Sequence, residues 1–434
     1  MNKTKISEPI PFLNRLFLIL VVIFPAFVSA QSTLSTFLDS AMINNPEAAS
    51  IHAQIQSYQY DNQMIEATLR SPKAFLSSDM LIAPYLNNGG NLIATSPSDQ
   101  AIGYDSGITN GGLYSMLFNL ELPVLKGKQV AHLQEQNQVE TDRLKTQLKL
   151  IENELKRTIG GLYFDALVQQ ATVESNKQNN ALLNEEFQLV KTLTNKGLYR
   201  ISDYKLIELE LKSDSINLNS SINDLELIIR QLKVACGIRN LDILSLESPA
   251  IEMSKPDSRH SLFIRSFAHD SLATAAQQKV FNDRYLPQLN VFANSGLNSN
   301  SIPNIQRHFG ASAGLQLTYN LFDGHQRKIN QDQQQVHLNA ASVQKELKLK
   351  EVGTQAETYL QNIIKTEAEL AKQKKIQAEY KDLFILYQDE VKRAQISVIN
   401  LIALLQKRSE VNLAVTIKEI TIKKLINEYN YWNH

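Results

Sequence analysis

The chain has 434 residues, with 44 Lys and Arg against 44 Asp and Glu, so its formal net charge at pH 7 is zero. A neutral chain lacks the concentrated basic surface that a phosphate backbone requires, so we expect no nucleic-acid partner. Its 16 Gly and 12 Pro are few for this length, which favours long, uninterrupted helices. The single cysteine, Cys236, excludes an intrachain disulfide and a cysteine-rich metal centre.

The N-terminal residues 1–30 have the pattern of a secretory signal peptide. Basic residues precede an apolar run at 16–28, and a small-residue cleavage site ends at Ala30. An uncleaved membrane anchor is the alternative, but the apolar run is shorter than the roughly 20 residues that span a bilayer. We therefore expect an exported chain that begins at Gln31, in which any membrane-spanning segment consists of strands.

The chain repeats its pattern at a constant offset. The passage 120–129 matches 317–326, with Gly127 opposite Gly324, and the same offset carries 197–204 onto 394–401. Two landmarks in one register indicate a duplication. We assign the first copy to residues 31–240 and the second to residues 257–434.

Each copy is predicted to contain a helix, two strands separated by a loop, a very long helix and, after a break, a further helix. About 70 residues without proline follow Gly127 and again follow Gly324, and as a helix each stretch would extend about 105 Å. The final segment of each copy has apolar residues at heptad spacing, which is typical of packed antiparallel hairpins. The Gly160-Gly161 pair within the first long helix indicates close helix packing or a local bend. The expected strands are 75–86, 112–124, 288–297 and 309–322, and the expected helices are 126–195, 200–236, 324–393 and 397–432.

The strand segments alternate apolar and polar residues. In 309–321, for example, every second residue from Phe309 is apolar while the residues between are Gly or polar, which is the period of a strand with one apolar face. A soluble, half-buried sheet is one interpretation, and outer-membrane strands of about 10 residues are the other. The long helices favour the second, because strands that continue into such helices form a conduit. Four strands cannot close a barrel, so the residues allow a dimer with eight strands or a trimer with twelve.

At this point the sequence resembles the TolC family of outer-membrane efflux proteins, the outer membrane factors, over essentially the whole mature chain. The resemblance is carried by the following features: strand starts after Pro72 and Pro287, strand-to-helix passages at 125–127 and 322–324, and the turn 196–203. It implies a mainly α fold with a small β part: a long antiparallel coiled-coil barrel plus four transmembrane strands per chain in a shared trimeric β-barrel. The implied location is the outer membrane, with the helical tunnel in the periplasm. The implied partners are two further copies of the chain, outer-membrane lipid, a periplasmic adaptor (membrane fusion) protein and an inner-membrane pump.

The resemblance also implies where the adaptor binds. Family members contact it through the helix-tip turns, which here contain Gly197 and Leu198 in the first copy and Ala394 and Gln395 in the second. The second turn departs from the family, which commonly has Gly where Ala394 stands, and Ala does not readily adopt positive φ.

A gate near the tips is a further implication of the resemblance. Family members can carry an acidic ring just past the second tip, but this chain has Asn400 and Ala403 there, so the charged ring is absent. Asp203 keeps an acidic residue at the matching place in the first copy. We leave two roles open for Asp203: a polar latch that holds the tip closed, or the N-terminal cap of the following helix.

We find no pattern for catalysis, a metal or a cofactor. The eight His residues form no pair at helical spacing, and there is no phosphate-binding glycine loop or nucleophile elbow. The expected function is the passive outer-membrane exit duct of a tripartite efflux or type I secretion system, driven by the inner-membrane pump. The alternatives are a periplasmic coiled-coil scaffold or adaptor without a pore, and a secreted enzyme with an unrecognised carboxylate pair.

Overall fold

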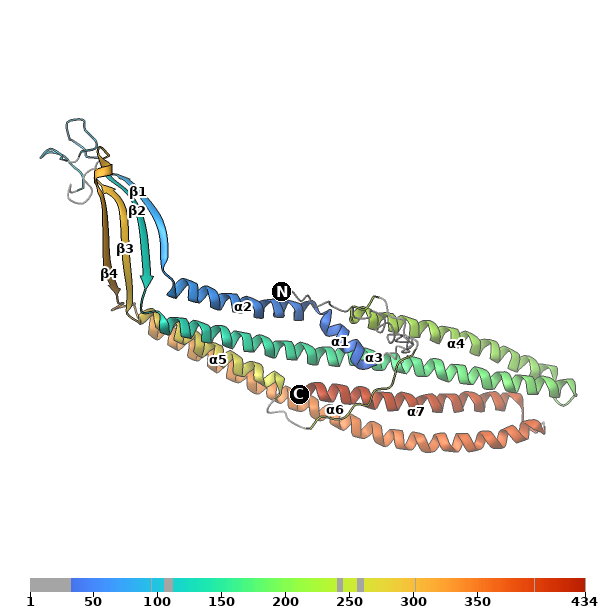
Figure 1. Ribbon diagram of the computed structural model, residues 1–434. Helices are drawn as coiled ribbons and strands as arrows, with labels where there is room; N and C mark the ends of the chain where they lie inside the picture. The colour runs from blue at the N-terminus through green and yellow to red at the C-terminus, as the bar shows by residue number, and fades with distance from the viewer. Residues whose placement is uncertain are drawn as a thin grey trace, which may run out of the picture.

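Figure 1 shows the computed structural model of the chain, an elongated molecule with a β-sheet at one end and long helices that run away from it. The structure describes residues 33–94, 96–104, 112–239, 245–255, 261–300, 302–393 and 395–433. The predicted signal peptide, residues 1–30, lies outside the described residues.

The sheet has four antiparallel strands in the order β1-β2-β3-β4. The strands are β1 (Lys73–Ile82), β2 (Gly112–Pro123), β3 (Gln288–Ser299) and β4 (Phe309–Thr318). Two strands end earlier than their alternation predicts, and proline explains both. Pro84 lacks the amide hydrogen that would continue β1 toward residue 86. Similarly, β4 stops at Thr318 because its partner Gln288 directly follows Pro287.

The helices fall into two groups by length. The two longest are α3 (Gly127–Asn195, 69 residues) and α6 (Gln326–Lys392, 67 residues), so each extends about 100 Å. The others are α1 (Leu34–Ile43), α2 (Pro46–Arg70), α4 (Ile201–Ala235), α5 (Leu262–Asn282) and α7 (Val398–Trp432), with short 3-10 turns η1 (Asp283–Tyr285) and η2 (Ile305–Arg307).

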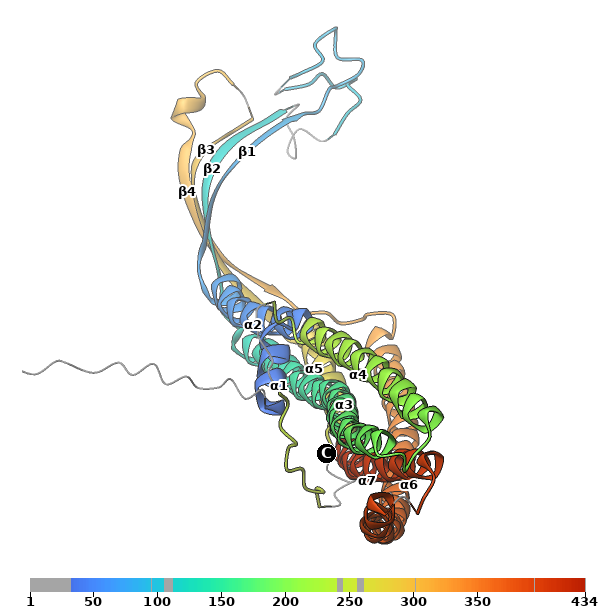
Figure 2. The same ribbon diagram turned by 90° about the vertical axis from the view of Figure 1, so that its right-hand side faces the viewer.

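The helices lie side by side in one curved layer (Figures 1 and 2). Near the sheet the neighbours are α2, α3, α5 and α6, and farther away they are α4, α3, α7 and α6. Helix α3 is therefore flanked on both sides along its length, while α2 and α4 form one border of the layer and α6 forms the other. The turns α3–α4 and α6–α7 both lie at the end farthest from the sheet (Figure 1).

Two apolar clusters hold the layer together. The first lies midway along α3, where Tyr163 and Phe164 pack with Phe37 of α1 and Ile420 of α7. The second lies near the two helix turns and joins the α3–α4 hairpin to the α6–α7 hairpin. Because apolar burial is the main favourable term in folding, these clusters fix how the hairpins lie against each other.

The close helix packing predicted at the glycine pair is confirmed for Gly160. A methyl group at Gly160 would lie 2.8 Å from the side-chain amide of Asn427 in α7, whereas one at Gly161 would meet no described residue within 4 Å. Asn427 also donates a hydrogen bond to the backbone oxygen of Arg157 (3.1 Å). The contact needs a residue without a side chain at position 160 only.

Among the described residues, none of the helices combines the length and the apolar character that crossing a bilayer requires. The predicted fold class is confirmed: the chain is mainly α, with long antiparallel helices and one small four-stranded antiparallel sheet.

Candidate functional site

The strand register separates the sheet into an apolar face and a polar face. Residues paired directly across an antiparallel ladder lie on the same face, and the pairs Leu76–Phe118, Met116–Leu297 and Leu289–Leu317 continue one face across all four strands. Its large side chains are exposed on the single chain, among them Leu76, Met80, Met116, Phe118, Leu315 and Leu317. An apolar face of this extent requires an apolar environment.

The opposite face is mainly polar and is held by side-chain hydrogen bonds across the strands. Ser115 Oγ donates to Asp79 Oδ2 (3.0 Å), Asn119 Nδ2 donates to Ser77 Oγ (2.8 Å), and Ser312 Oγ donates to Asn294 Oδ1 (2.8 Å). Such a face is suited to water rather than to lipid.

The first helix turn has a complete C-terminal cap. Gly197 has φ +76°, its N–H donates to Thr194 O (2.9 Å), and the N–H of Leu198 donates to Leu193 O (3.0 Å). This pair of bonds is the Schellman motif, which needs a left-handed residue after the helix and therefore favours glycine. Leu198 follows with its side chain 56% exposed, so the turn presents an apolar group at the far end of the molecule.

The second turn has the same backbone hydrogen bond, from a residue after the helix to the carbonyl five residues earlier. The N–H of Gln395 donates to Glu390 O (2.9 Å), at the place in the repeat where Leu198 donates to Leu193. Gln395 is exposed. Ala394, which stands opposite Gly197 in the repeat, lies outside the described residues.

The two predicted gate residues begin the two helices that follow the turns. Asp203 accepts the backbone N–H of Arg200 (3.1 Å), which is the capping role, one of the two roles left open for it. Asn400 donates its backbone N–H to Ser397 Oγ (3.3 Å), and its side chain is exposed. Within the described residues, no hydrogen bond or ion pair joins Asp203 to the second turn, so the latch stays a prediction.

One contact between the turns was not predicted. The hydroxyl of Tyr199 donates to the backbone oxygen of Ile396 (2.8 Å), and these two residues are equivalent positions of the repeat. Burial and the nearby carboxylates of Asp203 and Glu186 raise the pKa of Tyr199, so the phenol remains a donor. The only indication of this contact in the sequence is the hydroxyl group of Tyr199 within the turn 196–203.

A buried carboxylate lies between the two hairpins close to the turns. Glu186 of α3 is 5% exposed, and its Oε1 accepts a hydrogen bond from Gln388 Nε2 of α6 (3.3 Å). Its Oε2 is buried and has no hydrogen-bond partner among the residues that the structure describes. Burial raises the pKa of Glu186, Glu185 adds to this effect, and Lys392 opposes it.

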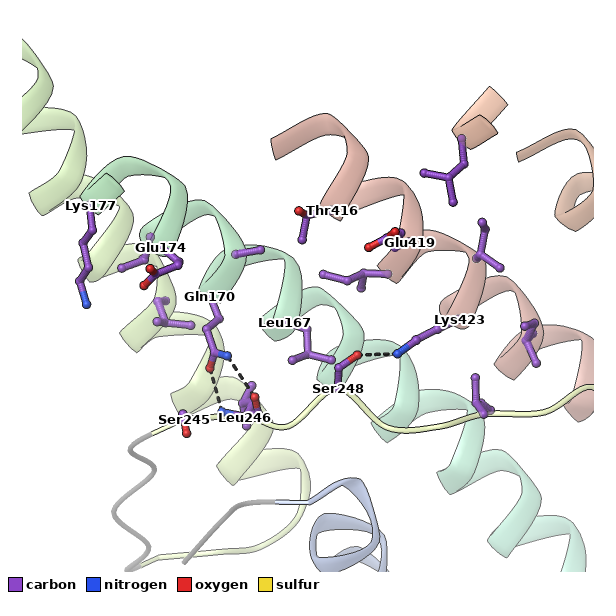
Figure 3. A pocket seen from close by; sticks show the side chains of 18 residues that line it. Leu167, Gln170, Glu174, Lys177, Ser245, Leu246, Ser248, Thr416, Glu419 and Lys423 are labelled. Atoms are coloured by element: carbon purple, nitrogen blue, oxygen red, sulfur yellow. Dashed lines mark hydrogen bonds between the residues drawn. The ribbon is translucent and has the colours of Figure 1, made fainter. Parts of the chain in front are cut away.

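The linker 245–255 crosses α3 and α7. Gln170 binds the backbone of Leu246 through both its amide atoms (2.8 and 3.0 Å), and Lys423 Nζ donates to Ser248 Oγ (2.6 Å), as Figure 3 shows. A cavity of about 860 Å³ lies beside this crossing, with mostly aliphatic walls. Because Gln170 and Lys423 are occupied by the linker, they fasten the two hairpins together.

Over the described ranges, no three His, Cys, Asp or Glu side chains lie close enough together to hold a metal ion. The geometry instead combines three features along one axis: a sheet with an apolar and a polar face, a layer of long helices, and two capped turns joined by Tyr199.

Comparison with known proteins finds the likeness in structure and not in sequence. No protein-family model matches the chain, and no curated protein matches it. Among solved structures, the Campylobacter jejuni CmeC outer membrane channel has a TM-score of 0.66 at 13% identity, over 92% of this chain and 86% of that chain. The open state of the Neisseria gonorrhoeae MtrE outer membrane channel has a TM-score of 0.66 at 12% identity, over 92% and 88%. CusC, whose structures address transmembrane channel formation, has 0.67 at 10% identity, over 93% and 92%. The chain therefore has the TolC-like fold that its sequence resemblance implied.

Proposed function

We propose that the chain is a subunit of an outer-membrane channel, the passive exit duct of a tripartite efflux or type I secretion system. The observation that carries this proposal is the sheet with one apolar and one polar face that continues into helices about 100 Å long. The apolar face meets lipid, the polar face lines a water-filled path, and the helices extend the path into the periplasm. The duct catalyses no reaction, and the fold likeness to CmeC and MtrE supports this role.

The channel requires several copies, because one sheet leaves two open edges. Each of β1 and β4 pairs with one neighbour only, and unpaired backbone groups are not tolerated in lipid. The border of α2 and α4 lies on the β1 side, and α6 lies on the β4 side. We propose a homotrimer in which β1 of one copy pairs with β4 of the next, giving twelve strands.

The helix borders support the same head-to-tail contact. Large apolar side chains remain exposed at heptad spacing on α6, at Ile329, Val336 and Val343, and on α4, at Leu209 and Ile216. A heptad stripe exposed to water is normally covered by another helix. A ring of identical copies covers both stripes at once, because the contact is heterologous and closes.

The partners belong to the two ends of the duct. We propose that the turns bind a periplasmic adaptor through Gly197, Leu198, Ala394 and Gln395, and that an inner-membrane pump supplies the energy. The exposed apolar side chain of Leu198 at the tip suits a protein contact. Asp203 and Asn400, at the starts of α4 and α7, are the proposed gate positions.

Native mass spectrometry of the protein extracted in mild detergent from the outer-membrane fraction tests the channel. We expect a trimer of the chain that begins at Gln31, and ion conductance when it is added to a planar lipid bilayer. A soluble monomer or dimer without membrane association would overturn the channel and leave the periplasmic scaffold.

Cysteine crosslinking tests the adaptor contact separately. The only cysteine of the chain, Cys236, is fully buried, so Leu198→Cys introduces one accessible thiol for a photo-crosslinker. We expect this variant to capture the co-expressed adaptor and Ile43→Cys, exposed on α1 far from the turns, to capture none. Equal capture by both variants contradicts an adaptor site at the turns.

A further inference from the structure

The junction between sheet and helices contains a small basic pocket. It lies where α3 begins, where α5 continues into η1, and where α6 begins, and its volume is about 280 Å³. The charged and aromatic side chains that line it are Lys128, His132, Lys279, Asp283, Tyr285 and Arg327.

Two of the basic side chains already have carboxylate partners. Lys279 Nζ lies 2.6 Å from Glu135 Oε1, and His132 Nδ1 lies 2.9 Å from both oxygens of the buried Asp283. Lys128 and Arg327 have no carboxylate within 4.0 Å in the part of the chain that the structure describes. Lys128 and Arg327 are therefore the two cations of the pocket without an ion-pair partner among the described residues, and they lie beside one buried carboxylate, that of Asp283.

The guanidinium of Arg327 is held in place without being neutralised. Its Nε donates to Asn282 Oδ1 (3.3 Å), and the group lies over the ring of Tyr285, 5.6 Å from the centroid. Tyr285 is fixed in turn by its hydroxyl, which donates to Asp323 Oδ2 (2.6 Å). The two Nη atoms of Arg327 are thus left for a bidentate contact with an oxyanion.

The positions of Lys128 and Arg327 in their helices strengthen the attraction of the pocket for an anion. Lys128 and Arg327 are the second residues of α3 and α6, where the helix dipole favours an anion. Next to the pocket, the passages from strand to helix expose Leu125, Leu321 and Phe322, the last two at 90% and 79%. Exposed apolar and aromatic side chains at the end of membrane strands are typical of the headgroup region.

We propose that Lys128 and Arg327 bind the phosphate group of an anionic ligand at this junction. Its sources are the headgroup of a phospholipid in the periplasmic leaflet and free phosphate in solution. The lipid source rests on the proposed function, because it requires the sheet to lie in the membrane. A bidentate guanidinium and an ammonium match a phosphate monoester or diester.

The test compares two double variants with the same change in charge. Lys128→Gln with Arg327→Gln removes the unpaired cations. The control, Arg70→Gln with Lys328→Gln, removes two junction cations that already have partners, Glu66 and Asp332 at 3.0 and 2.7 Å. Native mass spectrometry of protein with added phosphatidylglycerol measures lipid binding. We expect roughly tenfold weaker binding for the first variant and little change for the control.

A second arm distinguishes the two sources. Protein in nanodiscs of phosphatidylcholine is titrated with inorganic phosphate in a calorimeter. Binding of phosphatidylglycerol that the first variant loses assigns the site to lipid, and binding of inorganic phosphate alone that the variant loses assigns it to the free ion. Equal binding by the wild type and the first variant in both arms overturns the proposal.

The same spectra separate this proposal from the channel itself. A membrane-inserted trimer whose lipid and phosphate binding ignores Lys128 and Arg327 overturns the pocket and leaves the channel intact. A chain that stays soluble overturns the channel and the lipid source. A calorimetric titration of that soluble chain in buffer, without nanodiscs, then decides whether the two cations bind inorganic phosphate.

Discussion

Helices α3 and α6 hold equivalent places in the two copies and have almost the same length, yet they bury very different amounts of surface. Fifteen residues of α3 are buried, against four of α6. Gly160 of α3 packs against Asn427 of α7, whereas the equivalent position in α6 is the exposed Glu357. The repeat therefore preserves the length of the helix but not its surroundings.

The difference follows from position in the layer. Helix α3 has neighbours on both sides within the chain, while α6 is a border helix whose stripe of Ile329, Val336 and Val343 stays exposed. The apolar residues of α3 are covered within its own chain, whereas in the proposed trimer the exposed stripe of α6 is covered by a second copy. The four predictions below test this distinction, from the largest expected effect to the smallest.

The largest effect is expected on the border helix. Val336→Asp together with Val343→Asp places two charges where a neighbouring copy packs in the proposed trimer, and burying unpaired charges costs several kcal/mol in each interface. We expect native mass spectrometry to show monomer in place of trimer. Gln331→Asp with Gln344→Asp, on exposed positions of α6 outside the stripe, provides the control and retains the trimer. A trimer that survives the valine substitutions would show that α6 is not an interface.

The central helix is tested at adjacent glycines. Gly160→Ala forces its methyl group against Asn427 and costs about 1–3 kcal/mol. Gly161→Ala meets nothing within 4 Å and stabilises the helix by about 1 kcal/mol. Thermal unfolding followed by circular dichroism measures both. Identical shifts for the two variants would contradict close packing of α3 on α7.

The buried carboxylate of Glu186 makes the stability of the packing between the two hairpins depend on pH. Because burial raises the folded-state pKa of Glu186 above its ordinary value of 4.5, the packed hairpins bind a proton that the separated hairpins release. Their stability is full below pH 4.5, falls as the pH rises toward the raised value by at most about 1.4 kcal/mol per pH unit, and is level above it.

Glu186→Gln keeps the shape and removes the titration, so we expect hydrogen exchange near the turns to lose this pH dependence. Glu185→Gln, on the neighbouring exposed position, is the comparison: it removes a charge that raises the pKa of Glu186, so the pH dependence should move to lower pH but persist. A pH profile that is unchanged in the Glu186 variant assigns the titration to another group.

The smallest effect is expected at the contact between the turns. Tyr199→Phe removes the hydrogen bond to Ile396 and keeps the ring, which costs about 1 kcal/mol. If this bond helps to hold the tips together, single-channel recordings show a raised closed-state conductance. Tyr204→Phe, one turn into α4 and without a hydrogen bond from its hydroxyl in the described structure, is the comparison. Equal conductance in all three proteins would remove Tyr199 from the gate.

Much of the fold could be predicted because it depends on local, periodic signals. The alternation from Phe309 predicts a strand with an apolar face, and the proline-free stretch after Gly127 predicts a helix of this length. The early ends of β1 and β4 were missed because the apolar alternation continues past them. There Pro84 and Pro287 remove ladder hydrogen bonds, one of them on the partner strand.

The candidate site could be predicted only in part. Gly197 in a polar break indicates a turn by itself, since few other residues adopt positive φ. The bond from Tyr199 to Ile396 joins two hairpins that are far apart in sequence, so it depends on how the clusters around Val190 and Leu401 pack. The basic pocket likewise forms only where three helix ends meet. Its residues come from separate segments, so no spacing pattern within one segment predicts it.

The strand order has a consequence for how the protein is made. Strands β1 and β2, like β3 and β4, are sequence neighbours and can pair as soon as both have been synthesised. The central pairing is different: Pro123 pairs with Asn290, so the whole α3–α4 hairpin must be synthesised before β3 is available to pair with β2. Closing so large a loop is slow and carries an entropic cost. Until then β2 has an open edge, whose unpaired backbone groups are a template for pairing with other strands.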